Sequence, residues 1–194
     1  MSKTPRLDSL RARLDANTVV FDGLDAALLG VGICSTRIPL LVYDRDLILE
    51  ILVSRDGMTP EEAEDFCGDN IDCLWAGEGT PVLLSPFFEG EDTPFEDVFA
   101  DLDDALVGAG TQHSTPTVPV YDRDLVFRVL TEGEGMSPEA AETHFALHVE
   151  GAKWGDKTPL VLYRAEVEAP SGTSDETLDK ARARLQARHV LEGE

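Results

Sequence analysis

The residues of this sequence that could do chemistry include a Tyr-Asp-Arg-Asp run that occurs twice, at residues 43–46 and 121–124. Paired acids of this kind could transfer protons or hold a divalent ion. The same aspartates also suit a helix start, where they accept backbone hydrogen bonds and face the positive end of the helix dipole. We therefore predict helix caps here and no catalysis, and we keep Tyr43 and Tyr121 as weak candidates for ligand binding.

Three histidines could ligate a metal ion. His144 and His148 are four residues apart in a predicted helix, and His113 lies elsewhere in the second half. This spacing places two imidazoles on one helix face. The first half has Phe66 and Asn70 at the matching positions, and no CxxC or HExxH pattern supports a zinc site. The three histidines are thus weak metal-site candidates, and we expect no cofactor.

Two Gly-x-Gly pairs form a third candidate set, Gly30 with Gly32 and Gly108 with Gly110. In a strand, the glycines of each pair lie on one face, where a ligand or a neighbouring element can approach closely. Close packing explains them as well as ligand binding does. Because no phosphate-loop lysine accompanies them, they do not indicate a nucleotide fold. We keep all four as weak ligand-binding candidates.

Nucleophilic catalysis is also unsupported by the sequence. Ser35 and Ser114 lie in no nucleophile elbow, and Cys67 falls in a helical pattern that predicts burial. The three cysteines are an odd number and all lie in the first half, which favours reduced thiols. We predict that the protein is not an enzyme.

The two halves of the chain are copies of one unit. Residues 20–84 align without a gap with residues 98–162 at an offset of 78, and 25 of the 65 positions are identical. The identities gather in VYDRDL, in GMxPExAE and in GxxTP. Such self-similarity at a fixed offset indicates a duplication.

Each copy predicts the same order of elements. Asp44 is a helix N-cap and Gly57 a helix end, and Thr59 with Glu62 forms a capping box that the second copy lacks. Apolar runs before and after these two helices are typical of strands. The predicted fold class is α+β, with two tandem β-α-α-β repeats packed as one pseudo-symmetric body by continuing one sheet or by joining faces.

The predicted organisation has five parts: a basic N-terminal helix (1–19), repeat 1 (20–84), an acidic linker (85–97), repeat 2 (98–162), and a C-terminal strand or loop and helix (163–194). The sequences LDSLRARLDA, at residues 7–16, and LDKARARLQA, at 178–187, share seven of ten positions. We expect these terminal helices to pack on their own domain, with a homo-oligomer contact as the alternative.

The chain is strongly acidic, with 16 basic and 38 acidic residues and a formal net charge of −22. This charge opposes direct binding to nucleic acid or to an anionic membrane. A high-salt cytoplasm, a GC-rich genome or imitation of DNA could each produce it. No apolar run reaches the roughly 18 residues of a membrane span and no secretory signal is present, so we expect a cytoplasmic protein in a host cell.

The succession VYDRDLILEIL, GMTPEEAEDF, Asn70 and GEGTP resembles a family of small uncharacterised proteins of tailed bacteriophages and prophages. The resemblance covers residues 24–84 and 102–162 and implies a viral origin, without an activity or catalytic residues. In that family the unit occurs once, and here it is doubled. The second copy has His148 in place of the Asn, and the first has Cys73 where Gly151 keeps the usual glycine.

The leading functional hypothesis is a non-enzymatic, virus-encoded protein that binds a host or viral protein, as in host takeover or anti-defence. One alternative is a DNA mimic that blocks a nucleic-acid-binding protein. Two others are a protein that sequesters a small ligand and a metal-dependent enzyme that uses the three histidines. Each alternative stays open at this point.

Overall fold

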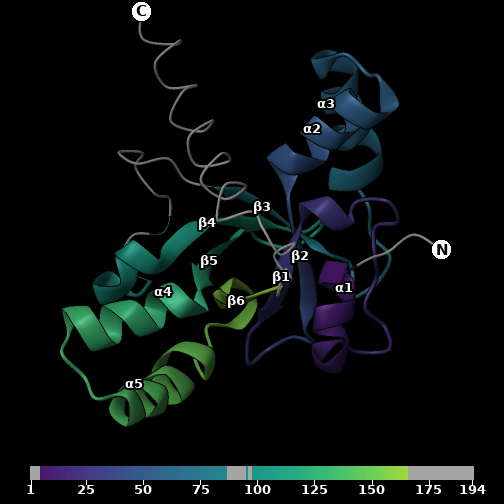
Figure 1. The fold of residues 1–194 in the computed structure, drawn as a ribbon. Coiled ribbons are helices and arrows are strands. Elements are labelled where there is room, and N and C mark those ends of the chain that lie inside the picture. Colours follow the sequence, from purple (N-terminus) through teal and green to yellow (C-terminus); the bar gives the residue numbers. More distant parts are fainter. Residues whose placement is uncertain (1–4, 87–94, 96–97, 166–194) are drawn as a thin grey trace, which may run out of the picture.

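Six β-strands form one closed barrel, in which each strand pairs with the next and the last returns to the first (Figure 1). The computed structural model describes residues 5–86, 95 and 98–165. The strands are β1 (Leu28–Ile33), β2 (Leu40–Asp44), β3 (Val82–Pro86), β4 (Leu106–Thr111), β5 (Val118–Asp122) and β6 (Leu160–Arg164). In each half the first two strands form an antiparallel hairpin and the third pairs parallel with the second. The halves join at two antiparallel seams, β3–β4 and β6–β1.

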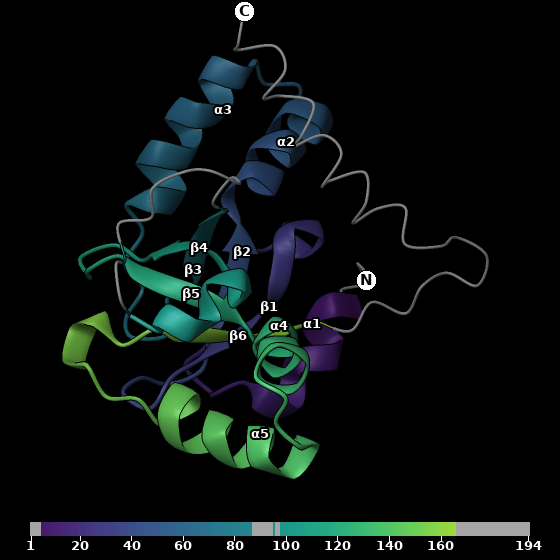
Figure 2. The same cartoon turned by 90° about the vertical axis from the view of Figure 1, so that its left-hand side faces the viewer.

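Helices fill the connection between the second and third strand of each half. They are α2 (Arg45–Asp56) and α3 (Pro60–Cys67) in the first half, and α4 (Arg123–Arg128) and α5 (Pro138–His144) in the second. Helical turns extend three of them: Gly68–Asp72 after α3, Val129–Gly133 after α4 and Phe145–Glu150 after α5. Figure 2 shows the two helix pairs on opposite sides of the barrel, as does Figure 1.

The predicted helix ends are confirmed. Asp44 accepts a hydrogen bond from the Leu47 backbone N–H, and Gly57 ends α2 in the left-handed conformation. Thr59 and Glu62 form the expected capping box at the start of α3. Because these signals depend only on neighbouring residues, they can be identified from the sequence.

The predicted fold class is wrong. Each half has the order β-β-α-α-β, and the six strands close into a barrel, whereas two open β-α-α-β repeats were expected. The sequence analysis missed β2 and β5, since it assigned the residues before Asp44 and Asp122 to no strand. These two short strands are buried on both faces. They therefore lack the alternation of apolar and polar residues that identifies a half-exposed strand.

The core has three layers. The barrel interior holds nine buried side chains: Cys34, Leu40, Val42, Val82, Leu84, Val118, Val120, Leu160 and Leu162. Two outer clusters lie between the barrel and the helices, one in each half, around Tyr43 and around Tyr121. Each half therefore contributes strands to a shared interior and covers its own outer face.

A short N-terminal helix, α1 (Pro5–Leu10), packs on β1. Its Leu10 is buried, and the Arg6 guanidinium donates to the backbone oxygens of Ala26 (2.7 Å) and Leu28 (3.0 Å). A basic N-terminal helix was predicted over residues 1–19, and the structure has α1 at Pro5–Leu10, packed on the first half. The predicted C-terminal helix and most of the acidic linker lie outside the described residues.

Candidate functional site

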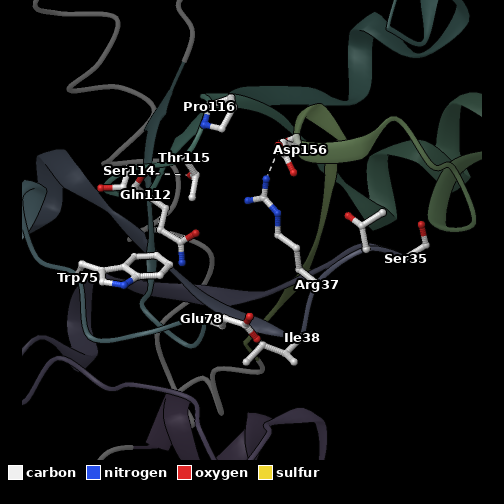
Figure 3. A pocket seen from close by; sticks show the side chains of 11 residues that line it. Ser35, Arg37, Ile38, Trp75, Glu78, Gln112, Ser114, Thr115, Pro116 and Asp156 are labelled. Atoms are coloured by element: carbon white, nitrogen blue, oxygen red, sulfur yellow. Dashed lines mark hydrogen bonds between the residues drawn. The ribbon is translucent and has the colours of Figure 1, made fainter.

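One end of the barrel carries a cavity of about 570 Å³. Four loops surround it: the hairpin loop of each half and the segment that enters the third strand of each half (Figure 3). The lining residues are Ser35, Thr36, Arg37, Ile38, Trp75, Glu78, Gln112, Ser114, Thr115, Pro116 and Asp156. Both copies of the repeat are thus needed to make this cavity.

Three hydrogen bonds between the halves hold these loops together. Ser35 Oγ donates to the Ala152 carbonyl oxygen (2.5 Å). Arg37 Nη2 donates to the Asp156 carbonyl oxygen (2.5 Å), as Figure 3 shows. In the reciprocal direction, Gln112 Nε2 donates to the Thr80 carbonyl oxygen (2.6 Å). The side chain of Gln112 is buried. Because the contacts cross the seam in both directions, they fix the shape of the cavity entrance.

The repeated Gly-x-x-Thr-Pro motif builds the turn that enters the third strand. Thr80 Oγ1 accepts from the Ala76 N–H (2.9 Å) and donates to the Gly77 carbonyl oxygen (2.7 Å). Thr158 does the same with Trp154 and Gly155, at 2.9 and 2.7 Å. A buried hydroxyl that pairs both its donor and its acceptor stabilises a turn without an unsatisfied polar group. The motif therefore positions two of the four loops around the cavity.

The lining combines a large aromatic surface with charges of both signs. Trp75 is 48% exposed although tryptophan is usually highly buried. Arg37, Glu78 and Asp156 are charged, and among the described residues no histidine or cysteine lines the cavity. Ser114 has φ of 64°, the one positive φ of a residue other than glycine in the described ranges. Strained backbone of this kind gathers at binding sites.

The two candidate tyrosines lie in the core and not in the cavity. Each is 1% exposed and packs against the phenylalanine that begins its repeat, Phe21 for Tyr43 (5.0 Å between ring centroids) and Phe99 for Tyr121 (5.1 Å). The Tyr43 hydroxyl accepts a hydrogen bond from the Phe21 backbone N–H (3.2 Å). Burial raises the pKa of Tyr43 to about 12. The same phenylalanine–tyrosine contact therefore occurs in both copies of the repeat.

The first aspartate of each Tyr-Asp-Arg-Asp run lies where a strand meets a helix. Asp122 caps α4 and accepts from Arg164 Nε of β6. Asp44 caps α2, and β3 has no arginine beside it, because Pro86 occupies the position that matches Arg164. Burial consequently raises the pKa of Asp44. These placements agree with capping, as predicted.

The four candidate glycines lie at the barrel seams and in its interior. A Cβ atom added to Gly30 would lie 2.1 Å from the Tyr163 carbonyl oxygen on β6, and one on Gly108 would lie 2.4 Å from the Ser85 carbonyl oxygen on β3. Gly32 and Gly110 face valines of the interior at 3.0 and 2.8 Å. None of the four lines the cavity. Close strand approach accounts for all of them.

The histidines are divided between two places. His113 is exposed in the hairpin loop of the second half. His144 and His148 lie next to each other, with ring centroids 4.7 Å apart, and line a smaller cavity of about 130 Å³ with Asp101 and Glu134. Within the described ranges, no three His, Cys, Asp or Glu side chains are arranged to hold a metal ion.

Sequence reasoning did not identify most of the cavity residues. Ser35 and Ser114 were considered only as nucleophiles, and Arg37, Trp75 and Gln112 were not considered. A usable signal existed, because the copies differ at these loop positions. Arg37 matches Thr115, Trp75 matches Lys153, and Gln112 matches Cys34. In a duplicated chain, divergence in loops that share one barrel end favours a single composite site.

Comparisons with protein-family models, with curated proteins and with solved structures find no match to this chain. The resemblance to a phage protein family therefore stays a prediction. Among the described residues, none of the helices has the length and apolarity that crossing a membrane requires.

Proposed function

We propose that this protein binds a small molecule in the cavity at the loop end of the barrel. This is the small-ligand alternative of the sequence analysis. A cavity of about 570 Å³ falls in the usual range for ligand pockets. The single observation that carries the proposal is that loops of both halves meet around this cavity.

Three features of the lining support this function. Trp75 exposes nearly half of its surface, which offers a flat face for stacking. The hydrogen bonds of Arg37 and Gln112 across the seam hold the loops before a ligand arrives, which lowers the entropy lost on binding. Ser114 holds strained backbone at the rim. The described residues of the lining include no histidine or cysteine, so binding is a better match to them than nucleophilic catalysis.

A fragment screen by ligand-observed NMR tests the proposal. Fragments should bind the wild-type protein and lose most of their affinity in Trp75→Ala. Trp154→Ala is the matched control, because Trp154 is exposed to a similar extent (45%) and does not line the cavity. If no fragment binds, or if binding survives Trp75→Ala unchanged, the proposal is wrong.

A protein partner is the second candidate, because large apolar side chains are exposed elsewhere. Phe66 is 39% exposed, Leu147 is 65% exposed and Trp154 is 45% exposed. Capture of tagged protein from host lysate at low and high salt tests this function, with Leu147→Asp as the comparison. A salt-resistant partner that Leu147→Asp loses would favour a packed interface, whereas one released at high salt would favour charge-based binding such as DNA mimicry.

A further inference from the structure

Three charged side chains line the cavity, those of Arg37, Glu78 and Asp156. Arg37 and Glu78 both line it, and neither forms an ion pair with any residue of the described ranges. Figure 3 shows the Arg37 guanidinium directed toward Asp156, and the Glu78 carboxylate next to Ile38.

The Arg37 guanidinium is suited to a carboxylate. One of its nitrogens, Nη2, is fixed on the Asp156 carbonyl oxygen, and no other hydrogen bond of the group occurs among the described residues. The remaining N–H groups keep the planar fork that matches carboxylate oxygens. The backbone contact therefore orients the guanidinium and leaves it able to bind an anion.

The Glu78 carboxylate is suited to an ammonium group. Glu78 is exposed and lies three residues after Trp75 in the same loop. A carboxylate accepts hydrogen bonds from an ammonium group, and an indole face attracts a cation. Ile38 and Pro116 add apolar surface to the lining.

The charge of the whole protein limits which ligands can use these groups. With a net charge of −22, the field of the protein disfavours a ligand of net negative charge. A ligand that carries both charges has no net charge and can still pair with each group. We propose that the cavity binds a zwitterion, a small molecule with a carboxylate at Arg37 and an ammonium group at Glu78, and this inference rests on the proposed function.

The structure also assigns one such site per chain. The positions that match Arg37 and Trp75 in the second half are Thr115 and Lys153, so the pair of charges with an aromatic face occurs once. Thr115 itself lines the same cavity. The expected stoichiometry is one zwitterion per protein.

Matched probes test the charge requirement. The zwitterions are a series of ω-amino acids, from glycine to 6-aminohexanoate, and 4-(aminomethyl)benzoate. The single-charge controls are the corresponding amines and carboxylates, with benzylamine and 4-methylbenzoate for the aromatic member. Dissociation constants are measured by NMR titration at low salt. At least one zwitterion should bind about tenfold more tightly than both of its controls, since each charge-assisted contact adds to affinity.

Two variants should separate the two contacts. Arg37→Gln should remove the advantage of the zwitterion over the matched amine, and Glu78→Gln its advantage over the matched carboxylate. Arg128→Gln and Glu132→Gln change the net charge equally at exposed residues outside the cavity and should leave the binding unchanged. Melting curves of all four variants show whether each one is folded.

The outcomes also separate this inference from the proposed function. If fragments bind at Trp75 but no zwitterion exceeds its single-charge controls, the charge inference is wrong and small-molecule binding stands. If the control variants weaken binding as much as the cavity variants, the field of the whole protein governs affinity and the assigned contacts are wrong. If no probe or fragment binds at all, both proposals fall together.

Discussion

Adding one methyl group at Gly30 should open the barrel where it closes. In Gly30→Ala the new Cβ atom would lie 2.1 Å from the Tyr163 carbonyl oxygen and 2.9 Å from the Arg164 Cα atom. Both contacts are with backbone, so no side-chain rotation can relieve them. The β1–β6 seam must therefore separate at this end, where Gly30 pairs with Arg164.

The expected loss in the free energy of unfolding is about 3 kcal/mol. Overpacking costs about 1–3 kcal/mol, and each lost backbone hydrogen bond of the seam adds about 1 kcal/mol. For a chain of this length, that loss lowers the melting temperature by about 6–12 °C. Urea unfolding followed by circular dichroism measures the free energy, and a thermal scan measures the melting temperature.

Two further variants make this result specific. Gly108→Ala, which repeats the contact at the β3–β4 seam with a Cβ position 2.4 Å from the Ser85 carbonyl oxygen, should cost a similar amount. Gly68→Ala is the control, since Gly68 has helical φ and no atom within 4 Å of the added Cβ, and it should be neutral or slightly stabilising. Wild-type stability in Gly30→Ala would refute the closed seam.

Three other perturbations have defined outcomes. Tyr43→Phe removes the acceptor of the part-buried Phe21 N–H and should lower the free energy of unfolding by about 1 kcal/mol in urea titrations; an unchanged midpoint would contradict this hydrogen bond. Burial raises the folded-state pKa of Asp44 above 3.8, because it disfavours the charged carboxylate. The contribution of Asp44 to the free energy of unfolding is therefore full below pH 3.8, where the carboxyl is protonated, and is lost as the pH rises through the folded-state pKa. Asp44→Asn, which keeps a good helix cap, should therefore gain stability relative to wild type between about pH 3.5 and about pH 7, and a difference that is constant with pH would exclude the shift. Of the three thiols, exposed Cys73 should react quickly with a disulfide reagent at about pH 8, whereas buried Cys67, with its pKa raised to about 11, should stay protected; Cys73→Ser should abolish the fast phase.

Local signals in the sequence predicted local structure correctly, and the closed barrel was beyond their reach. The helix caps at Asp44, Gly57 and Thr59 are fixed by contacts within a few residues. The strands β2 and β5 are five residues long and run directly into helix caps, so their apolar residues resemble the start of a helix. β5 also contains Pro119, which pairs with Ala109 of β4, and proline is unfavourable inside a sheet because it has no backbone N–H.

Closure of the sheet and the place of the cavity depend on contacts between distant residues. The pairing of Val31 with Tyr163 joins the start of one repeat to the end of the other, and no local pattern specifies such a pair. The candidate tyrosines and glycines were chosen for identity between the copies, which selected residues of the core and of the barrel seams. The cavity instead uses residues that differ between the copies, such as Arg37 and Trp75, because it is built once from two unlike loops.

The two seams of the barrel have the same register, and this bears on how such a chain could arise. Gly30 pairs with Arg164 at one seam and Gly108 with Pro86 at the other, so both joins match at the repeat offset of 78 residues. A single unit would expose its first and third strands as two unpaired edges, and each edge is complementary to the other edge of a second unit. An ancestral gene encoding one repeat would thus yield a two-fold symmetric dimer, in which two identical sets of loops would surround one cavity at the same end of the barrel. Fusion into one chain freed the two hairpin loops to evolve separately, which a symmetric dimer forbids.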